Sequence, residues 1–351
     1  MRKHAFFLIL VPVILLTTAC TRKIIKSPDA SEILVYPPPP NLPRVQFLTY
    51  IRNSDDIVRS PSWFHRFFLG KEKPKPIMRP YGLHVGGDIL YVCDPGIQGL
   101  EIINLREHRF TWFRPTGIGQ LRMPLNCAVD DSGYLYVADA YRRQVVVYDA
   151  GLQYVTAFGE EENFKPVDVA FLKDRIYVTN LEGRNVCVYE RKDKKLLFTF
   201  PDAQKGEEAF LYKPTTLHIS EDMIYVTDFG EVRIKIYDAA GKYLKAVGSY
   251  GRNPGQMVRP KGITTDQDRN LYVVDAAFEN VQLFNPEGHL LMAMGGAGNM
   301  NLPAGIALSR DNLDTFREYL YKDYEMLFLI FVANQYGPDK IGVYAFIRKI
   351  K

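Results

Sequence analysis

The sequence predicts an all-β fold built from six copies of one four-stranded unit, and three observations lead to this prediction. The first is composition: the 351 residues include 22 Tyr, 21 Phe, 26 Gly and 22 Pro, and 24% are charged. Aromatic residues favour strands, whereas Gly and Pro favour the tight turns that join them. The second is a recurring string of the form YVxD, and the third is a proline that opens each repeat. A helical bundle is therefore not expected.

Each repeat begins at a proline and contains up to four short strands. The opening prolines stand at positions 80, 124, 166, 214, 260 and 303, with spacings of 44, 42, 48, 46 and 43 residues. The second strands read YVCD, YVAD, YVTN, YVTD, YVVD and FVAN. A third strand follows, as in VVVYD and IKIYD, and five units also have a fourth strand. Four strands at a period in the forties are the signature of a β-propeller blade.

The sixth unit reaches the C-terminus without a fourth strand, so the ring needs a closing strand from elsewhere. Residues 44–50 (RVQFLTY) match the fourth-strand pattern, and pairing them with residues 341–347 would cover two open sheet edges. We therefore predict a six-bladed propeller over residues 43–351, closed by its N-terminal strand. Within the last blade, residues 311–325 predict a small helical insertion, because apolar residues recur at helical spacing: Leu313, Phe316, Leu320 and Tyr324.

The repeated motif, Pro-x-x-φ-x-φ followed by a Gly-containing turn and YVxD, resembles the NHL repeat family. This resemblance covers residues 43–351 and implies a six-bladed β-propeller of NHL type, a fold that many unrelated functions use. Strand alternation places the connections from each fourth strand to the next blade, and from each second to third strand, on one face. We call it the top face and expect the long loop 52–78 there. The insertion and the N-terminal tether are expected on the opposite, bottom face.

Residues 1–20, MRKHAFFLILVPVILLTTAC, are predicted to be a secretory signal, because Arg2 and Lys3 precede an apolar run and small residues. The apolar run is short for a membrane span. The small residues that end at Cys20 resemble the lipobox of bacterial lipoproteins, which implies a diacylglycerol on the Cys20 thiol. Thr21 follows in place of Asp, which in the proteobacterial sorting pattern implies the outer membrane.

Residues 21–42 predict a flexible, proline-rich tether between this anchor and the propeller. Four consecutive prolines, Pro37 to Pro40, predict a stiff polyproline II rod of about 12 Å. The net charge of the chain is only +4, so its charge does not predict a surface that binds nucleic acid.

A polar residue ends every second strand. A ring of carboxylates is one way to hold a cation, but a side chain repeated once per blade normally bonds the backbone of the following turn. We therefore interpret these residues as structural: Asp94, Asp139, Asn180, Asp228, Asp275 and Asn334.

Two of the six histidines, His84 and His218, occupy equivalent places on the first strands of opposite blades. A metal that bridges them across the central channel is one hypothesis. Zinc needs three or four ligands, however, and the other blades have no histidine there, so we favour two separately hydrogen-bonded side chains and no cofactor. The equivalent residues are Ala128, Ala170, Thr264 and Ala307.

The peptidyl-amidoglycolate lyases resemble this chain in repeat form but carry metal-binding histidines directly after the blade proline. That enzyme branch is excluded because those positions here hold Tyr81, Leu125, Val167, Thr215, Lys261 and Ala304. Neither G-x-S-x-G nor H-E-x-x-H occurs in the sequence. Cys93, Cys127 and Cys187 are predicted to be small buried hydrophobic residues, although an exported chain permits a disulfide.

Aromatic residues and arginines gather in the predicted top-face loops, and both types are enriched in protein interfaces. They are Tyr141, Arg142, Arg143, Arg184, Phe229, Arg233, Phe278 and Tyr336. The alternative is that these side chains merely cover the blade tops. Residues 60–75 add an aromatic cluster, Trp63, Phe64, Phe67 and Phe68, which we interpret as packing on the propeller.

The sequence thus predicts a lipid-anchored, non-catalytic recognition or scaffold protein of the bacterial cell envelope. Its top face would bind a protein, a peptide or a glycan. The alternative is a metal-dependent hydrolase or lyase that acts at the channel mouth, where the nearest polar residues are Asn126, Asp168, Thr216 and Thr264.

Overall fold

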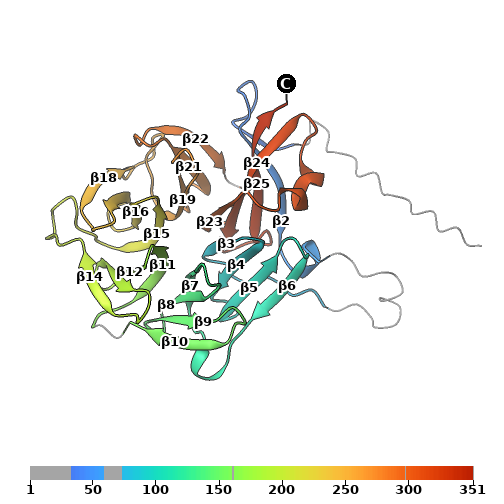
Figure 1. The fold of residues 1–351 in the computed structure, drawn as a ribbon. Helices are drawn as coiled ribbons and strands as arrows, with labels where there is room; N and C mark the ends of the chain where they lie inside the picture. Colours follow the sequence, from blue (N-terminus) through green and yellow to red (C-terminus); the bar gives the residue numbers. More distant parts are fainter. Residues whose placement is uncertain (1–32, 59–72, 160–161, 297, 351) are drawn as a thin grey trace, which may run out of the picture.

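The computed structural model of the chain describes residues 33–58, 73–159, 162–296 and 298–350. Six antiparallel sheets stand around one axis, and the first strand of each blade lies innermost (Figure 1). The innermost strands are β3 (Leu83–Gly86), β7 (Pro124–Val129), β11 (Pro166–Leu172), β15 (Pro214–Ser220), β19 (Pro260–Thr265) and β23 (Pro303–Ser309). The predicted all-β six-bladed propeller is confirmed.

The second and third strands form the middle of each blade and are buried on both faces by the neighbouring blades. All five residues of β8 are buried, for example, which explains why the YVxD strings are almost continuously apolar. The second strands are β4 (Ile89–Asp94), β8 (Leu135–Asp139), β12 (Arg175–Asn180), β16 (Met223–Asp228), β20 (Leu271–Asp275) and β24 (Tyr324–Asn334). The third strands are β5 (Gly99–Asn104), β9 (Gln144–Tyr148), β13 (Asn185–Glu190), β17 (Arg233–Asp238), β21 (Asn280–Phe284) and β25 (Ile341–Lys349).

The fourth strands lie towards the outside of the ring, and in blades one to five each has exposed residues. In β14, for example, Leu197 and Thr199 point to solvent whereas Phe200 is buried. In blade six no residue of the fourth strand is exposed. These strands are β6 (Arg109–Phe113), β10 (Tyr154–Phe158), β14 (Leu196–Phe200), β18 (Tyr243–Val247), β22 (Leu290–Gly295) and β2 (Val45–Ile51).

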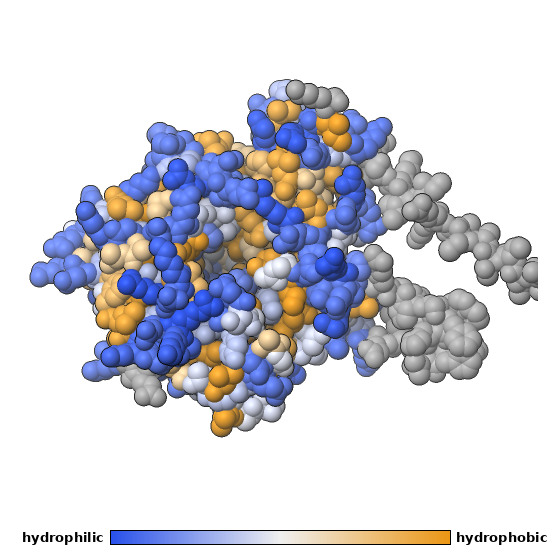
Figure 2. Space-filling model, in the orientation of Figure 1, coloured by the Kyte–Doolittle hydropathy of each residue, from blue (hydrophilic) through white to orange (hydrophobic). Residues whose placement is uncertain are grey.

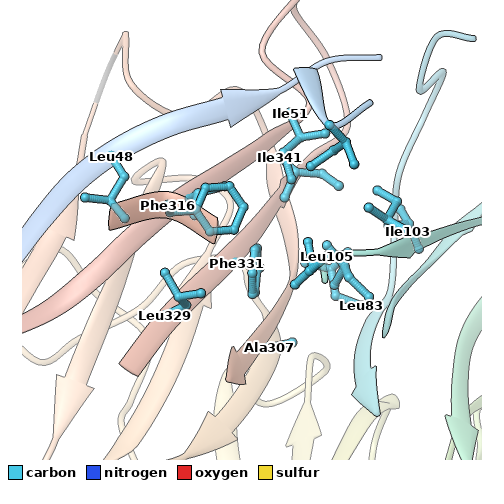
Figure 3. Packing of buried hydrophobic residues seen from close by; sticks show 14 of the residues in the cluster. Leu48, Ile51, Leu83, Ile103, Leu105, Ala307, Phe316, Leu329, Phe331 and Ile341 are labelled. Atoms are coloured by element: carbon cyan, nitrogen blue, oxygen red, sulfur yellow. The ribbon is translucent and has the colours of Figure 1, made fainter. Parts of the chain in front are cut away.

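The ring closes as the sequence predicts, because β2 pairs with β25 in antiparallel register, from Val45 opposite Phe346 to Ile51 opposite Ile341. Leu48 and Ile51 of β2 are buried in one cluster with residues of blades one and six (Figure 3). The N- and C-terminal parts of the fold are therefore held together by one sheet and one core.

The proline run does not form the predicted polyproline II rod. Strand β1 (Val35–Tyr36) folds back on β2, with Val35 opposite Gln46 and Tyr36 opposite Val45, so Pro37 to Pro40 lie in the connection of a hairpin. The Arg44 N–H donates to the Tyr36 carbonyl at 2.7 Å, and the Phe47 N–H donates to the Leu34 carbonyl at 2.9 Å. The sixth blade therefore has five strands, and Leu34 lies beside the outer edge of β2 rather than on the bottom face.

The insertion in blade six forms the short 3₁₀ helix η3 (Leu313–Tyr319), and Tyr324 already belongs to β24, so the predicted helix is shorter than expected. Phe316 enters the core shared by blades one and six (Figure 3). The Gln46 amide donates to the Tyr319 carbonyl at 2.8 Å and accepts from the Tyr321 N–H at 3.1 Å. The insertion thus braces the closing strand.

Two other 3₁₀ turns, η1 (Ser54–Asp56) and η2 (Gly117–Gly119), lie in top-face connections.

Several predicted features lie outside the described residues: the signal segment 1–20 with Cys20, residues 21–32 of the tether, and the aromatic residues Trp63, Phe64, Phe67 and Phe68. Within the part of the chain that is described, no helix is long and apolar enough to cross a bilayer. Cys93, Cys127 and Cys187 are buried, as expected for small hydrophobic residues.

Candidate functional site

The polar residues that end the second strands organise the top-face loops through backbone hydrogen bonds. The Asp139 carboxylate accepts from the N–H groups of Arg122 and Met123, which enter the blade, and from those of Tyr141 and Arg142 in the following turn. Asp94, Asp228 and Asp275 also join the entering segment to the turn of their own blade. Asn180 and Asn334 make related bonds through their amide groups. Their bonding agrees with the structural interpretation.

A cavity of about 410 Å³ runs along the propeller axis, where the first strands meet, and Figure 2 shows the ring hollowed at its centre. Its lining extends from Asn126, Asp168 and Thr216 downward and includes Asp131 in the β7–β8 turn. Because the Asp131 side chain is 96% exposed, the cavity reaches solvent at the bottom face.

The innermost strands come together closely above this cavity. A Cβ atom at Gly305 would lie 2.4 Å from the Tyr81 carbonyl oxygen, and one at Gly262 would lie 2.4 Å from the Ala304 carbonyl oxygen. Glycine therefore permits a backbone contact that any side chain would prevent. Only about 10 Å³ of space remains at the level of Tyr81 and Lys261, so the channel is narrow at its top mouth.

The polar residues suggested for the metal-dependent alternative form hydrogen bonds between blades. Asp168 accepts from the Val169 N–H at 2.8 Å and from the Leu217 N–H of the next blade at 2.9 Å, and the Asn126 side chain also bonds to it. Burial raises the pKa of Asp168 to about 7, although these hydrogen bonds act in the opposite direction. Thr216 likewise bonds to the Lys261 carbonyl of blade five. These side chains hold neighbouring blades together, whereas Thr264 lines the cavity below them.

His84 and His218 have matching and separate hydrogen bonds. His84 Nε2 accepts from the Val129 N–H at 3.3 Å, and His218 Nε2 accepts from the Thr265 N–H at 3.2 Å, in each case from the next blade. Burial lowers the pKa of each histidine to about 4, so both rings are neutral at pH 7. Among the described residues, no three His, Cys, Asp or Glu side chains are grouped as a metal site would require.

The predicted top-face residues differ widely in how accessible they are. Tyr141 is 69% exposed and Tyr336 is 55% exposed, whereas Phe229 and Phe278 are half-buried. Arg142 is held by the Ile118 and Gln120 carbonyls. Arg143 pairs with Glu182 at 2.7 Å, Arg233 pairs with Glu231 at 3.6 Å, and Arg184 is exposed. Tyr141 and Tyr336 are therefore the aromatic residues of this set that are free to contact a partner.

Exposed apolar side chains are concentrated on the top face. Of the fourteen large hydrophobic residues that are exposed within the described ranges, seven lie in top-face connections: Val58, Met78, Ile118, Met123, Tyr141, Tyr250 and Tyr336. Four others, Val155, Leu197, Leu244 and Leu291, lie on outer strands of the rim. Exposed apolar side chains that share one face of a protein are candidates for contacts with a partner.

A group of cations at the top mouth of the channel was not predicted from the sequence. Lys261 of blade five donates to the Gln335 amide oxygen at 2.8 Å and lies over the Tyr81 ring, 5.2 Å from its centroid. Burial, followed by Arg259 and Arg79, lowers the pKa of Lys261 to about 8. The signal was present in the sequence, because a basic residue precedes the blade proline in RPYG, KPVD, KPTT and RPKG.

Charged residues inside two blades were also not predicted from the sequence. Lys235 in β17 is fully buried and forms ion pairs with Glu231 at 2.6 Å and Asp228 at 3.6 Å. The equivalent residue of blade one is Glu101, whose pKa is raised well above its usual value by burial and then by Asp94. Each breaks the apolar pattern of its third strand, which was the available signal. Neither reaches the top surface.

Comparisons with known proteins support this architecture. The model of the family DUF5128, described as a 6-bladed beta-propeller, matches residues 204–334. A structural genomics protein of unknown function from Bacteroides thetaiotaomicron superposes with a TM-score of 0.57 at 14% identity, covering 87% of this chain and 76% of that one.

Two lyases have a similar fold. A catalytically inactive virginiamycin B lyase from Staphylococcus aureus, with quinupristin, has a TM-score of 0.54 at 14% identity and covers 77% of this chain and 95% of its own. A streptogramin B lyase has a TM-score of 0.53 at 14% identity and covers 77% of this chain and 84% of its own. At this identity the likeness concerns the fold, and the chain is a six-bladed β-propeller.

Proposed function

We propose that this protein is a non-catalytic recognition or scaffold protein of the bacterial cell envelope, built on an NHL-type propeller. Its top face binds a protein, peptide or glycan, and a lipid on Cys20 anchors it in the outer membrane. The anchor and the location rest on the sequence of residues 1–21 alone.

The observation that carries the binding function is the distribution of exposed apolar side chains. Half of the large hydrophobic residues that are exposed in the described part of the chain lie in the loops of one face, and Tyr141 and Tyr336 are the most accessible of the aromatic residues predicted to bind. Tyrosine is enriched at binding hot spots because it combines a large apolar ring with a hydroxyl group. The hydrogen bonds of Asp139 hold the Tyr141 loop in place, so the ring is presented by an ordered backbone.

The bonding of the axial residues supports binding rather than catalysis. The acceptor atoms of His84 and His218 and both oxygens of Asp168 are engaged by backbone N–H groups of the propeller itself. A group in such a role holds the structure together, whereas a general base or a metal ligand needs an acceptor directed at the reacting molecule.

Replacing Tyr141 and Tyr336 together by Ala is expected to weaken capture of the native envelope partner by about 2 kcal/mol or more, as for a central aromatic hot spot. The measurement is a quantitative pull-down from native envelopes, with thermal unfolding as a check on folding. Tyr319→Ala is the matched control, because Tyr319 is an exposed tyrosine in η3 on the bottom face. Equal capture by the double variant and the unaltered protein would contradict the proposal.

A further inference from the structure

The top mouth of the channel collects positive charge from two blades that flank blade six. Arg259 and Lys261 stand on either side of Pro260 in blade five, and Arg79 precedes Pro80 in blade one. In blade six the corresponding residues are Leu302 and Ala304, which carry no charge. Lys261 donates to Gln335 and the Arg79 guanidinium lies over the ring of the next residue, Tyr336, so both cations contact one loop of blade six, and Arg259 lies two residues before Lys261.

No ion pair neutralises this group within the part of the chain that the structure describes. Lys261 donates to Gln335, which is uncharged, and the Arg79 guanidinium lies over the Tyr336 ring at 5.7 Å. The nearby carboxylates are engaged by backbone N–H groups. Asp94 and Asp275 accept from the N–H groups of Arg79 and Arg259 and of their own turns, and Asp168 is buried below the mouth among N–H groups. Like charges held together without a counter-charge are unfavourable, and an anion placed among them removes that penalty.

We propose that the top mouth is a binding site for an oxyanion group of the ligand, held by Lys261, Arg259 and Arg79. Arginine and lysine are the usual donors to carboxylate and phosphate groups, and the fork geometry of a guanidinium suits both. Because the channel is constricted at this level, the anionic group rests at the mouth while the rest of the ligand extends over the top face towards Tyr336. This proposal names the chemistry of the ligand and rests on the proposed top-face recognition.

The test uses inorganic phosphate and acetate as separate probes and follows Lys261 directly. The pKa of the Lys261 ammonium group is measured by NMR on protein whose lysines are labelled with ¹³C at Cε, at constant ionic strength. The signal that disappears in Lys261→Arg is assigned to Lys261. An anion that binds the ammonium form at least tenfold more tightly than the amine will raise the Lys261 pKa by one unit or more. If only phosphate raises the Lys261 pKa, the anionic group of the ligand is a phosphoryl group. If only acetate raises it, the group is a carboxylate.

Variants then locate the site. Lys261→Met and Arg259→Gln are each expected to weaken binding of the responding anion at least tenfold. Lys213→Met is the matched control, because Lys213 precedes the proline of blade four on the same face. A Lys261 pKa that neither anion changes, or anion affinity that these two substitutions alter less than twofold, would overturn the proposal.

Partner capture separates this site from the proposed function. If capture is lost with Tyr141→Ala and Tyr336→Ala but is kept by Lys261→Met, the top face recognises its partner and the oxyanion site is wrong. If anion binding is present and capture tolerates every top-face substitution, the oxyanion site stands and the proposed recognition fails.

Discussion

A chain that begins at Arg52 is expected to lose cooperative unfolding, because it lacks the strand that closes the ring. Val45 and Ile51 of β2 are almost completely buried, and Leu48 is 7% exposed. Burial of three aliphatic side chains is worth about 6 kcal/mol, which is comparable to the whole stability of a typical domain. Removing β2 also uncovers the backbone edge of β25.

Two longer chains are the controls for this experiment. A chain that begins at Ile33 retains both β1 and β2 and is expected to melt like the complete propeller. A chain that begins at Asn41 loses only β1, where Val35 and Tyr36 are buried, so we expect a smaller loss of about 4 kcal/mol. Thermal and urea unfolding measure all three. A monomeric chain from Arg52 that is as stable as the one from Ile33 would show that the ring closes without β2.

Acid is expected to destabilise the propeller through His84 and His218. Burial lowers the pKa of each native histidine to about 4, whereas an unfolded histidine titrates near 6.5. Between these values the unfolded state binds protons that the native state does not, so stability falls as the pH decreases from about 6.5 to 4. The loss approaches about 3 kcal/mol for each histidine, or about 6 kcal/mol for the pair.

Asp168 changes the free energy of unfolding in the opposite direction over nearly the same pH range. Its native pKa is raised to about 7, so its contribution to stability is present at low pH and is lost as the pH rises towards 7. A single pH profile therefore combines the two effects. Comparing variants at each pH isolates the histidines, because Asp168 is common to all of them.

The informative variant replaces both histidines by Gln, whose amide oxygen can accept the same backbone N–H. The free energy of unfolding of this double variant is expected to fall much less between pH 7 and pH 4 than that of the unaltered protein. His289→Gln, at an exposed position in the turn before β22, is the matched control. Urea titrations across this range provide the measurement. Parallel profiles for the double variant and the unaltered protein would rule out the histidines as the origin of acid sensitivity.

The repeat made most of the fold predictable, because the same physical pattern recurs in every blade. Each YVxD strand is apolar since neighbouring blades cover both of its faces, and its final Asp or Asn bonds the loops around it. The closing strand was also predictable, because residues 44–50 carry a fourth-strand pattern at the other end of the chain. A recurring signal is strong because each copy is an independent observation.

Features that occur once were less predictable. The four prolines indicated an extended rod, but Val35 and Tyr36 gain a sheet partner and an apolar site on blade six, and these tertiary contacts decide the conformation. The insertion has an apolar face at helical spacing, yet it ends after seven residues because Gln46 bonds its backbone and β24 begins at Tyr324. Local periodicity does not reveal either partner.

The candidate site depends on contacts between blades, which the sequence does not display. Tyr141 and Phe229 stand in corresponding loops, and only the structure shows that one ring is exposed and the other half-buried. Arg79 and Lys261 are 182 positions apart, and closure of the ring brings them to one mouth. The sequence contained the residue types, whereas the geometry defined the group.

Site-specific photocrosslinking in native cells tests the recognition function most directly. A photoreactive amino acid is placed at Tyr141 or Tyr336 on the top face, or at Tyr319 on the bottom face. Top-face recognition predicts that the two top-face positions crosslink to the same envelope component and that the Tyr319 position does not. Crosslinking to that component from Tyr319 alone, or equally from all three positions, would contradict it.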